Sequence, residues 1–410
     1  MDIEKIIQIK ENNKKLSQEQ IDFMVSGFIN GSISKQDMSR FLIAIYNNSL
    51  CKKETYYLFD SMLNQSSVLN LDQLGPTIDK HSTGGVSDST SILLVPLYAL
   101  FGFKCLKMSG GALGHTGGTA DKILLFEGLK NEISIESAIS LTKQNGGCFI
   151  ASNQELAIAD KKIYALRNEI DAVMSIPLIA TSIMSKKVAC GAKNIVLDVK
   201  YGNGALMKDK KDAIKLGKLM KYLGGCYGRN VSIVYGDMNQ PLGEFVGDYV
   251  EVLEVIDLLK NPKSSRLLNH TLKLLSKGVY KQLGKSEKEI IMQAKKMIED
   301  KTALNKLKEI ISSQGGSLKL FDESLPVPKY LIKSNMEGVL NFINCEKLGN
   351  LDHKLKNQKG YLGFKISKSL QDKVVNGDVL FEIYCKCDID INQNEFISCL
   401  EIKDEIGNWM

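Results

Sequence analysis

The residue types best suited to chemistry gather between residues 80 and 122, in the stretch KHSTGGVSDSTSILLVPLYALFGFKCLKMSGGALGHTGGTADK. It contains three Gly pairs, several hydroxyl side chains, four lysines and two of the chain's four histidines. Backbone N–H groups at glycines, Ser and Thr hydroxyls and Lys ammonium groups all donate hydrogen bonds to phosphate oxygens, and a helix N-terminus adds its dipole. The stretch therefore predicts an anion pocket built from two Gly-rich loops and their flanks.

These loops could instead be ordinary turns or a dinucleotide-binding loop. A single Ser or Thr in a loop is usually a turn residue, but here many donors occur together in two loops. A dinucleotide-binding loop is also rich in glycine, yet its GxGxxG pattern after a first strand is missing. The combination favours a site for a small anion.

Short apolar strands alternate with helices around these loops. The expected strands are Lys104–Met108, Cys148–Ser152, Asn194–Val199 and Val231–Tyr235. The expected helices are Thr90–Phe101, Ile135–Asn145, Asp212–Leu223 and Val250–Leu259. Such alternation is typical of a mainly parallel sheet covered by helices.

The N-terminal segment shows helix signals without strands between them. Ser17 with Gln20 forms a capping box, and Gly31 is suited to end that helix. Ser34 with Asp37 starts a second helix, and a third follows through residues 56–62. Three short amphipathic helices predict a helical layer, to which the segment between residues 160 and 190 returns.

These patterns predict an α/β protein with a small all-helical domain, a larger mixed α/β domain with a mainly parallel sheet, and a C-terminal β-rich module. The module is indicated by short strands around Asn376-Gly377-Asp378, a turn signal. The expected parts are helical (1–69 and 154–193), α/β (70–153 and 194–326) and β-rich (327–410).

Composition and charge argue against a nucleic-acid-binding, membrane or secreted protein. The net charge of +6 is modest, and no dense basic stripe with interleaved aromatics appears, so nucleic acid is not an expected partner. No segment has the apolar length of a membrane span, and the charged N-terminus does not read as a secretory signal. Nine scattered cysteines fit reduced thiols, which indicates a cytoplasmic protein.

Several long motifs resemble, in order and spacing, those of the pyrimidine-nucleoside phosphorylase and thymidine phosphorylase family. The motifs are DKHSTGGVSD, KMSGGALGHTGGTADK, ADKKIYALRNEIDAVMSIPLIATSIMSKK, IVLDVKYGNGALM and DMNQPLGEFVG. The resemblance is close over residues 16–254 and weaker beyond. It implies reversible phosphorolysis of a pyrimidine nucleoside (uridine, thymidine or deoxyuridine) to free base and a pentose 1-phosphate, with phosphate as co-substrate and no organic cofactor.

The resemblance also implies which residues bind each substrate. The expected phosphate ligands are Lys80, His81, Ser82, Ser91, Lys107, Ser109 and Thr119. The pyrimidine is expected on Arg167, Ser182 and Lys186. The last two are four residues apart in a helical segment and share a face. Arg167 and Lys186 would stabilise the negative charge that develops on the departing base.

Two further roles follow from the resemblance. His81 is the candidate to handle a proton near the leaving group, although phosphorolysis by charge stabilisation alone leaves it a structural role. A potassium ion would be held by hard oxygen ligands, backbone carbonyls and one carboxylate, at Ser87, Ser89, Leu242, Phe245 and Glu254. Glu254 as an ordinary carboxylate on a helix surface is an equally good interpretation.

The chain departs from the family pattern in places. Gly111 and Ala112 stand where the family has Arg and Gly, which removes a guanidinium beside the phosphate loop. Ser87 replaces a Gly, and residues 151–153 replace a Gly-Gln-Thr segment. Two alternatives therefore stay open: a weak or inactive homologue that binds nucleoside or phosphate, and a phosphoribosyltransferase of related fold. The family's manner of assembly implies a homodimer through the helical domain.

Overall fold

The computed structural model describes residues 1–111, 117–151 and 156–403. The chain divides into two compact units, each built from separate stretches of sequence. The first unit comprises Met1–His81, Ser152–Val199 and Lys211–Ile233, and the second comprises Ser82–Ala151, Lys200–Lys210 and Val234–Met410. The domain limits expected from the sequence stay a prediction.

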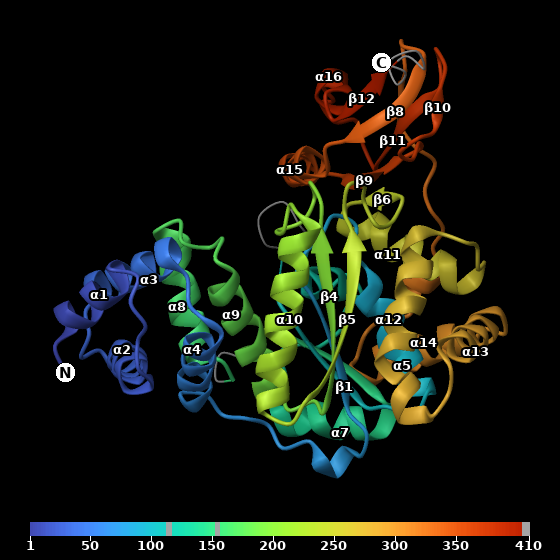
Figure 1. Cartoon of the computed structure of the whole chain (residues 1–410). Helices are drawn as coiled ribbons and strands as arrows, with labels where there is room; N and C mark the ends of the chain where they lie inside the picture. The colour runs from blue at the N-terminus through green and yellow to red at the C-terminus, as the bar shows by residue number, and fades with distance from the viewer. Residues whose placement is uncertain (112–116, 152–155, 404–410) are drawn as a thin grey trace. The chain divides into compact units, whose positions relative to one another are not determined.

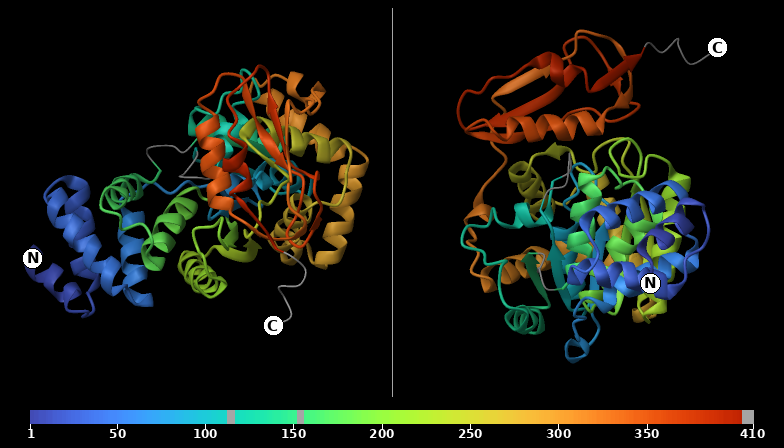
Figure 2. Two further views of the ribbon diagram at one scale, coloured as in Figure 1. Left: turned by 90° about the horizontal axis from the view of Figure 1, so that it is seen from above. Right: turned by 90° about the vertical axis from the view of Figure 1, so that its left-hand side faces the viewer.

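The first unit contains a helical bundle drawn from two parts of the chain. Its helices are α1 (Ile3–Glu11), α2 (Gln18–Asn30), α3 (Lys35–Asn48), α4 (Lys52–Asn64), α8 (Ile158–Glu169) and α9 (Ile176–Ala189). Figures 1 and 2 show the blue N-terminal helices beside the green α8 and α9. Among them, α4 packs on α9. The predicted return of the chain to the helical layer is therefore confirmed.

Local signals set the helix ends. Ser17 caps α2 in a reciprocal capping box with Gln20, and Gly31 ends it with φ of +87°. The side chain of Ser34 accepts from the backbone N–H of Asp37 at the start of α3. These three predictions are confirmed, but helix α1, which the side chain of Asp2 caps, was not predicted.

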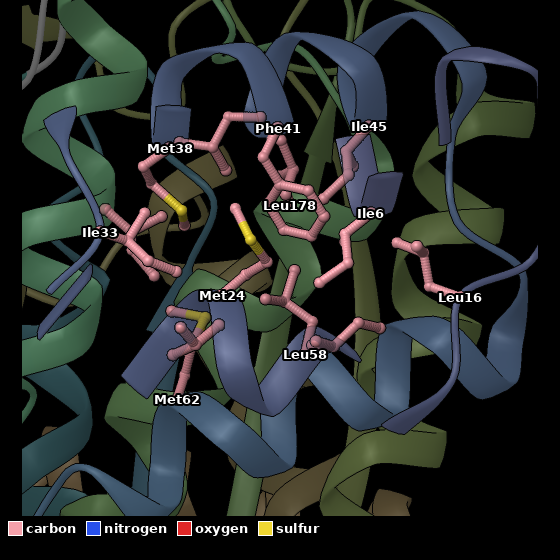
Figure 3. Packing of buried hydrophobic residues seen from close by; sticks show 14 of the residues in the cluster. Ile6, Leu16, Met24, Ile33, Met38, Phe41, Ile45, Leu58, Met62 and Leu178 are labelled. Carbon is pink, nitrogen blue, oxygen red and sulfur yellow. The ribbon is translucent and has the colours of Figure 1, made fainter. Parts of the chain in front are cut away.

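A dry apolar core holds the bundle together. Side chains from the N-terminal helices and from α9 point toward one another in Figure 3, among them Met24, Phe41, Leu58 and Leu178. All four are at most 1% exposed. Burying such a side chain stabilises the fold by about 1.5–3 kcal/mol relative to exposing it. Contacts from two separate sequence stretches thus fix α8 and α9, which carry the expected base-binding residues.

The first unit also contains most of a three-stranded sheet in the order β1-β4-β5, and the last residues of each strand belong to the second unit. Its strands are β1 (Ile78–Ser82), β4 (Asn194–Tyr201) and β5 (Asn230–Asp237), and helix α10 (Lys210–Cys226) links the last two. The arrows of β4 and β5 point the same way in Figure 1. A short 3₁₀ turn, η1 (Asp72–Leu74), precedes β1, the strand that the sequence interpretation missed.

In the second unit, β2 (Cys105–Ser109) pairs with β3 (Gly147–Ala151) in parallel, with Cys105 opposite Gly147. Helices α5 (Thr90–Leu100), α6 (Thr119–Ile123) and α7 (Ile135–Asn145) surround this pair. The helices that follow are α11 (Asp248–Lys260), α12 (Arg266–Leu283), α13 (Glu287–Glu299) and α14 (Thr302–Ser313), and α5 packs on α12 and α14. Each strand and helix predicted here is present within three residues of its expected ends.

The rest of the second unit is β-rich, as predicted. One antiparallel sheet has the order β6-β9-β11-β7, from Phe245–Val246, Tyr361–Ile366, Val379–Cys385 and Tyr330–Lys333. The other has the order β10-β8-β12, from Lys373–Val374, Gly338–Ile343 and Leu400–Lys403. The 3₁₀ turn η2 (Lys319–Asp322) and helices α15 (Cys345–Leu355) and α16 (Gln393–Ile397) complete it. Asn376 and Gly377 form the predicted turn, but the strands on either side join different sheets.

The fold class expected from the sequence is confirmed by the helical bundle, the α/β elements with parallel strands and the antiparallel C-terminal region. Within the described part of the chain, no helix has both the length and the apolar character needed to cross a bilayer.

Candidate functional site

Two of the expected phosphate ligands lie at the edge of the first unit, on strand β1. Lys80 is buried, and its Nζ lies 3.2 Å from Oδ2 of Asp198 on the neighbouring strand β4. His81 follows it and is half-buried. Lys80 therefore lies in the flank of the first Gly-rich loop, where strand pairing and a buried ion pair hold it in place.

The loop that follows β1 belongs to the second unit and is organised by one carboxylate. The hydroxyl of Ser82 donates to Oδ2 of Asp88 at 2.7 Å, and the N–H of Gly84 donates to Ser82 Oγ at 3.3 Å. Oδ1 of Asp88 accepts from the N–H and the hydroxyl of Thr90, at 3.3 and 2.5 Å. Ser91, another expected ligand, is buried in the first turn of α5. Asp88 therefore ties the start of the loop to the N-terminus of α5.

The remaining phosphate candidates lie along β2 and at the start of α6. Lys107 is buried on β2, and its Nζ donates to the carbonyl of Met108 at 3.4 Å. Oγ of Ser109 is buried and has no hydrogen-bond partner among the described residues. Thr119 is the first residue of α6. A buried hydroxyl without a partner is unfavourable, so the Ser109 Oγ is suited to an incoming ligand.

The base-binding candidates Ser182 and Lys186 share one face of α9, as predicted. Nζ of Lys186 lies 3.4 Å from Oγ of Ser182 and 2.8 Å from Oδ2 of Asp160 on α8. The lysine also lies 5.6 Å from the ring centre of Tyr164. Its side chain is 36% exposed, so the ammonium is held by a carboxylate and still reaches solvent.

Arg167 is the third base candidate, and its guanidinium is bound within the protein. Its Nε, Nη1 and Nη2 donate to the carbonyls of Ala172, Leu178 and Val173 at 3.1, 3.0 and 2.6 Å. The residue is 1% exposed, and burial lowers the pKa of its guanidinium to about 10. Arg167 thus holds the connection between α8 and α9 in this structure.

Two of the candidates for potassium, Ser87 and Glu254, place oxygen atoms beside Gly243 in the second unit. Ser87 has φ of +60°, the left-handed conformation that glycine adopts more easily. Its Oγ accepts from the N–H of Gly243 at 3.1 Å, and Oε1 of Glu254 accepts from the N–H of Glu244 at 2.9 Å. A Cβ on Gly243 would clash with both Ser87 Oγ and Oε2 of Glu254. Gly243 therefore leaves open a small space lined by oxygen atoms.

Glu254 is not the surface carboxylate that the sequence left as an alternative. Its Oε2 is buried without a hydrogen-bond partner among the described residues, and burial raises the pKa of the carboxyl to about 8. The hydroxyl of Ser89 donates to Oε2 of Glu251 at 2.9 Å, and its backbone carbonyl accepts from the N–H of Ile92 at 3.1 Å. Leu242 and Phe245 are buried nearby in sequence. A buried carboxylate oxygen without a partner among the described residues suits a hard monovalent cation, so Glu254 fits one.

Comparisons with known proteins identify the relatives of this chain. Residues 4–66 match the glycosyl transferase family helical bundle domain, and residues 74–313 match that family's a/b domain. Pyrimidine-nucleoside phosphorylase from Staphylococcus haemolyticus is 38% identical over 92% of this chain and 91% of its own length. Those from Geobacillus stearothermophilus and Bacillus subtilis are each 37% identical over the same shares. The chain belongs to the pyrimidine-nucleoside phosphorylase family.

The fold extends beyond this family. Anthranilate phosphoribosyltransferase from Thermus thermophilus superposes with a TM-score of 0.61, covering 76% of this chain and 99% of that one at 16% identity. At this identity the likeness concerns the fold alone.

The departures from the family pattern have local consequences. Gly111 is exposed, and a Cβ there would lie only 3.3 Å from Oδ1 of Asp121, so a longer side chain at that point would require the Asp121 carboxylate to shift slightly. Ser87 adopts the backbone conformation of the glycine that it replaces. Ala112 and residues 152–153 lie outside the described residues.

Several residues of these sites were not predicted from the sequence. They are the acidic partners of the expected ligands: Asp88, Asp160 and Asp198, together with Glu251, which accepts from Ser89 and pairs with Lys122. Asp88, Asp160 and Asp198 lie inside the motifs, so their positions in DKHSTGGVSD, ADKK and IVLDVKYGNGALM were the available signal. Glu251 is more than 100 residues away in sequence, and nothing local marks it.

Proposed function

We propose that this chain catalyses the reversible phosphorolysis of pyrimidine nucleosides, releasing the free base and a pentose 1-phosphate. The observation that carries the proposal is the likeness to pyrimidine-nucleoside phosphorylases over more than nine-tenths of the chain. Both expected ligand sets are present within that length. Phosphate and the nucleoside are the two substrates.

In this proposal, phosphate binds to Lys80, His81, Ser82, Ser91, Lys107, Ser109 and Thr119. Buried ammonium groups neutralise the dianion, and hydroxyls aim one of its oxygens at the sugar C1′. The buried Oγ of Ser109, which lacks a partner among the described residues, supports this role. Ser82 would have to turn its single hydroxyl proton from Asp88 to the phosphate.

The base binds to Arg167, Ser182 and Lys186, and negative charge develops on it as the glycosidic bond breaks. Lys186 supplies the positive charge for that step, since its ammonium is partly exposed while it pairs with Asp160. The guanidinium of Arg167 fixes the α8–α9 connection and lends its charge to the same region. His81 takes or returns the proton of the leaving base.

A potassium ion completes the proposal. The residues that would hold it are Ser87, Ser89, Leu242, Phe245 and Glu254, and the unpaired Oε2 of Glu254 supports this assignment. When bound, the ion supplies fixed positive charge beside a buried carboxylate and no redox or proton chemistry.

A homodimer and a cytoplasmic location belong to the same proposal. Ile43 and Tyr46 lie three residues apart on α3, and each is 40% exposed, which supports an interface on the helical bundle. The nine cysteines are free thiols, which supports a reducing compartment.

The test is to incubate the purified chain with uridine, thymidine and cytidine, with and without phosphate, and to measure free base. Phosphate-dependent release of uracil or thymine is expected, and it should not require magnesium. Nucleoside binding without release would support the inactive homologue. Base transfer that requires magnesium and a phosphoribosyl pyrophosphate would support the phosphoribosyltransferase instead.

A further inference from the structure

A buried cluster of charged and polar side chains in the second unit, formed by Asp88, Lys200 and His270, contacts the loop that begins at Ser82. Its centre is the carboxylate of Asp88, which accepts hydrogen bonds from Ser82 and Thr90. Nζ of Lys200, at the end of β4, lies 3.6 Å from Oδ2 of the same carboxylate. The backbone N–H of Lys200 also donates to the hydroxyl of Thr83 at 2.9 Å. Lys200 therefore contacts this loop through both its side chain and its backbone.

His270 on α12 completes the cluster. Its Nε2 lies 3.0 Å from Nζ of Lys200, whose side chain has no exposed surface. Because a lysine ammonium only donates, Nε2 of His270 must be the acceptor in this contact. The backbone of β5 leaves room for the two side chains, since a Cβ on Gly236 would lie 2.8 Å from Lys200 Cδ and 3.0 Å from His270 Cε1.

The arrangement connects His270 to a phosphate ligand through three successive contacts, by way of Lys200 and Asp88. Ser82 has one hydroxyl proton, and in this structure it is donated to Asp88. To donate to phosphate, the Ser82 hydroxyl must first break its hydrogen bond to Asp88, whose negative charge the Lys200 ammonium compensates. If Lys200 moved away, Asp88 would hold Ser82 more strongly and would stand as an uncompensated negative charge beside the incoming dianion.

We propose that Lys200 and His270 are positioning residues for phosphate: His270 aims the Lys200 ammonium at Asp88, and Asp88 in turn sets the Ser82 loop. This inference rests on the proposed phosphorolysis, in which Ser82 contacts phosphate. Neither residue is among those expected to bind the base, so we expect their effect to fall on phosphate. No motif in the sequence marks His270.

The test compares two substitutions at position 270 by steady-state kinetics. His270→Leu fills the space but cannot accept a hydrogen bond, whereas the amide oxygen of His270→Gln can replace Nε2. For His270→Leu, we expect the phosphate KM to rise by about tenfold, the change typical of losing one hydrogen bond to a charged group. The uridine KM and kcat should stay within about twofold, and His270→Gln should recover most of the loss.

The matched control is His353→Leu, because His353 is exposed on α15 and is not a member of the cluster. It should leave every kinetic constant and the melting temperature unchanged. An unchanged phosphate KM in His270→Leu would overturn the proposal. So would equal rises in both KM values that follow a fall in melting temperature and that His270→Gln does not reverse, since that pattern indicates a purely structural cluster.

A direct binding measurement separates this inference from the proposed function. If the wild-type chain releases no base, the proposed function fails, and the affinity of inorganic phosphate is then measured by calorimetry. Weaker phosphate binding in His270→Leu with recovery in His270→Gln would still support the positioning role. Equal affinity in all three proteins would refute it. Lys200→Met is not used alone, because removing a buried ammonium from Asp88 endangers folding.

Discussion

Lys186, which is expected to bind the base, and Lys80, which is expected to bind phosphate, are held in contrasting ways. Lys186 is 36% exposed and pairs with Asp160, whereas Lys80 is 3% exposed and pairs with Asp198. In the second unit, Lys122 and Lys200 are likewise buried against Glu251 and Asp88. A partly exposed ammonium is free to meet a charge that develops during reaction, while a buried one is fixed by folding.

Carboxylates beside the phosphate ligands add a second contrast. Among the residues expected to bind phosphate, Lys80 pairs with Asp198, and the hydroxyl of Ser82 donates to Asp88. On the helix face expected to bind the base, Ser182 and Lys186 lie together. Phosphate binding should therefore depend on a network of partners, and base binding on single residues. The four predictions below test this difference, from the largest expected effect to the smallest.

The first prediction concerns Lys186→Ala, which should lower kcat/KM for uridine by about 10²–10³-fold because one fixed positive charge is lost. Since Asp160 would then be a buried carboxylate without its cation, the variant is also made together with Asp160→Asn. The double variant should regain thermal stability but not activity. Lys161→Ala, at an exposed lysine on α8, is the control. Near-normal rates in Lys186→Ala would show that the base is bound elsewhere.

The second prediction concerns Arg167→Ala, which should lose stability as well as activity. Removing the guanidinium leaves three buried carbonyls unpaired. We expect the free energy of unfolding to fall by at least about 2 kcal/mol, measured by denaturant titration. Arg167→Lys retains the charge without the planar fork of donors, and it should be intermediate in stability. A variant that loses activity at unchanged stability would instead assign Arg167 to the substrate alone.

The third prediction concerns Ser109→Ala, which should raise the phosphate KM by about tenfold and leave the uridine KM unchanged. Its melting temperature should not fall, because the substitution removes a buried hydroxyl that has no partner among the described residues. Ser313→Ala is a suitable control, since the Ser313 hydroxyl already donates to the carbonyl of Ile310. A fall in stability with no change in phosphate KM would make Ser109 a structural residue.

The fourth and smallest effect should come from Glu254 and potassium. Burial raises the pKa of Glu254 to about 8, whereas a glutamate in the unfolded chain has a pKa of about 4.3. The stabilising contribution of the neutral carboxyl is therefore complete below about pH 4 and is lost as the pH rises to about 8. A bound cation favours the ionised form, so potassium should stabilise the protein most at alkaline pH.

Melting temperatures in potassium chloride and in tetramethylammonium chloride check this prediction at about pH 6 and about pH 9. Potassium should raise the melting temperature by a few degrees at the higher pH and by less at the lower one. Glu254→Gln should abolish the difference between the two salts. A salt difference that survives in Glu254→Gln would place the cation elsewhere.

Local signals predicted most of the secondary structure. The capping box of Ser17 and Gln20 and the left-handed Gly31 act within four residues of a helix end, so reading them needs no knowledge of the rest of the fold. Strand β1 was missed because its residues, Ile78 to Ser82, are mostly polar and gain their strand conformation by pairing with β4. Strand character of this kind arises from tertiary contacts.

The candidate sites were predictable to the extent that motifs carry them. Ser182 and Lys186 lie on one helix face because of their spacing alone. The carbonyl partners of Arg167 were not predictable, since they depend on how the chain turns between α8 and α9. His270 offered no local context, and only the approach of α12 to the end of β4 brings it to Lys200.

By itself, the sequence determined which groups are present: the donors of two Gly-rich loops, a helix face with a hydroxyl and an ammonium, and the caps that begin and end helices. Tertiary structure decided which of those groups are already satisfied. Ser89 meets Glu251 across 162 positions, and Lys187 meets Asp79 across 108. Ion pairs and hydrogen bonds over such separations form only when packing brings the strands and helices together, because the chain between them carries no local preference for the contact.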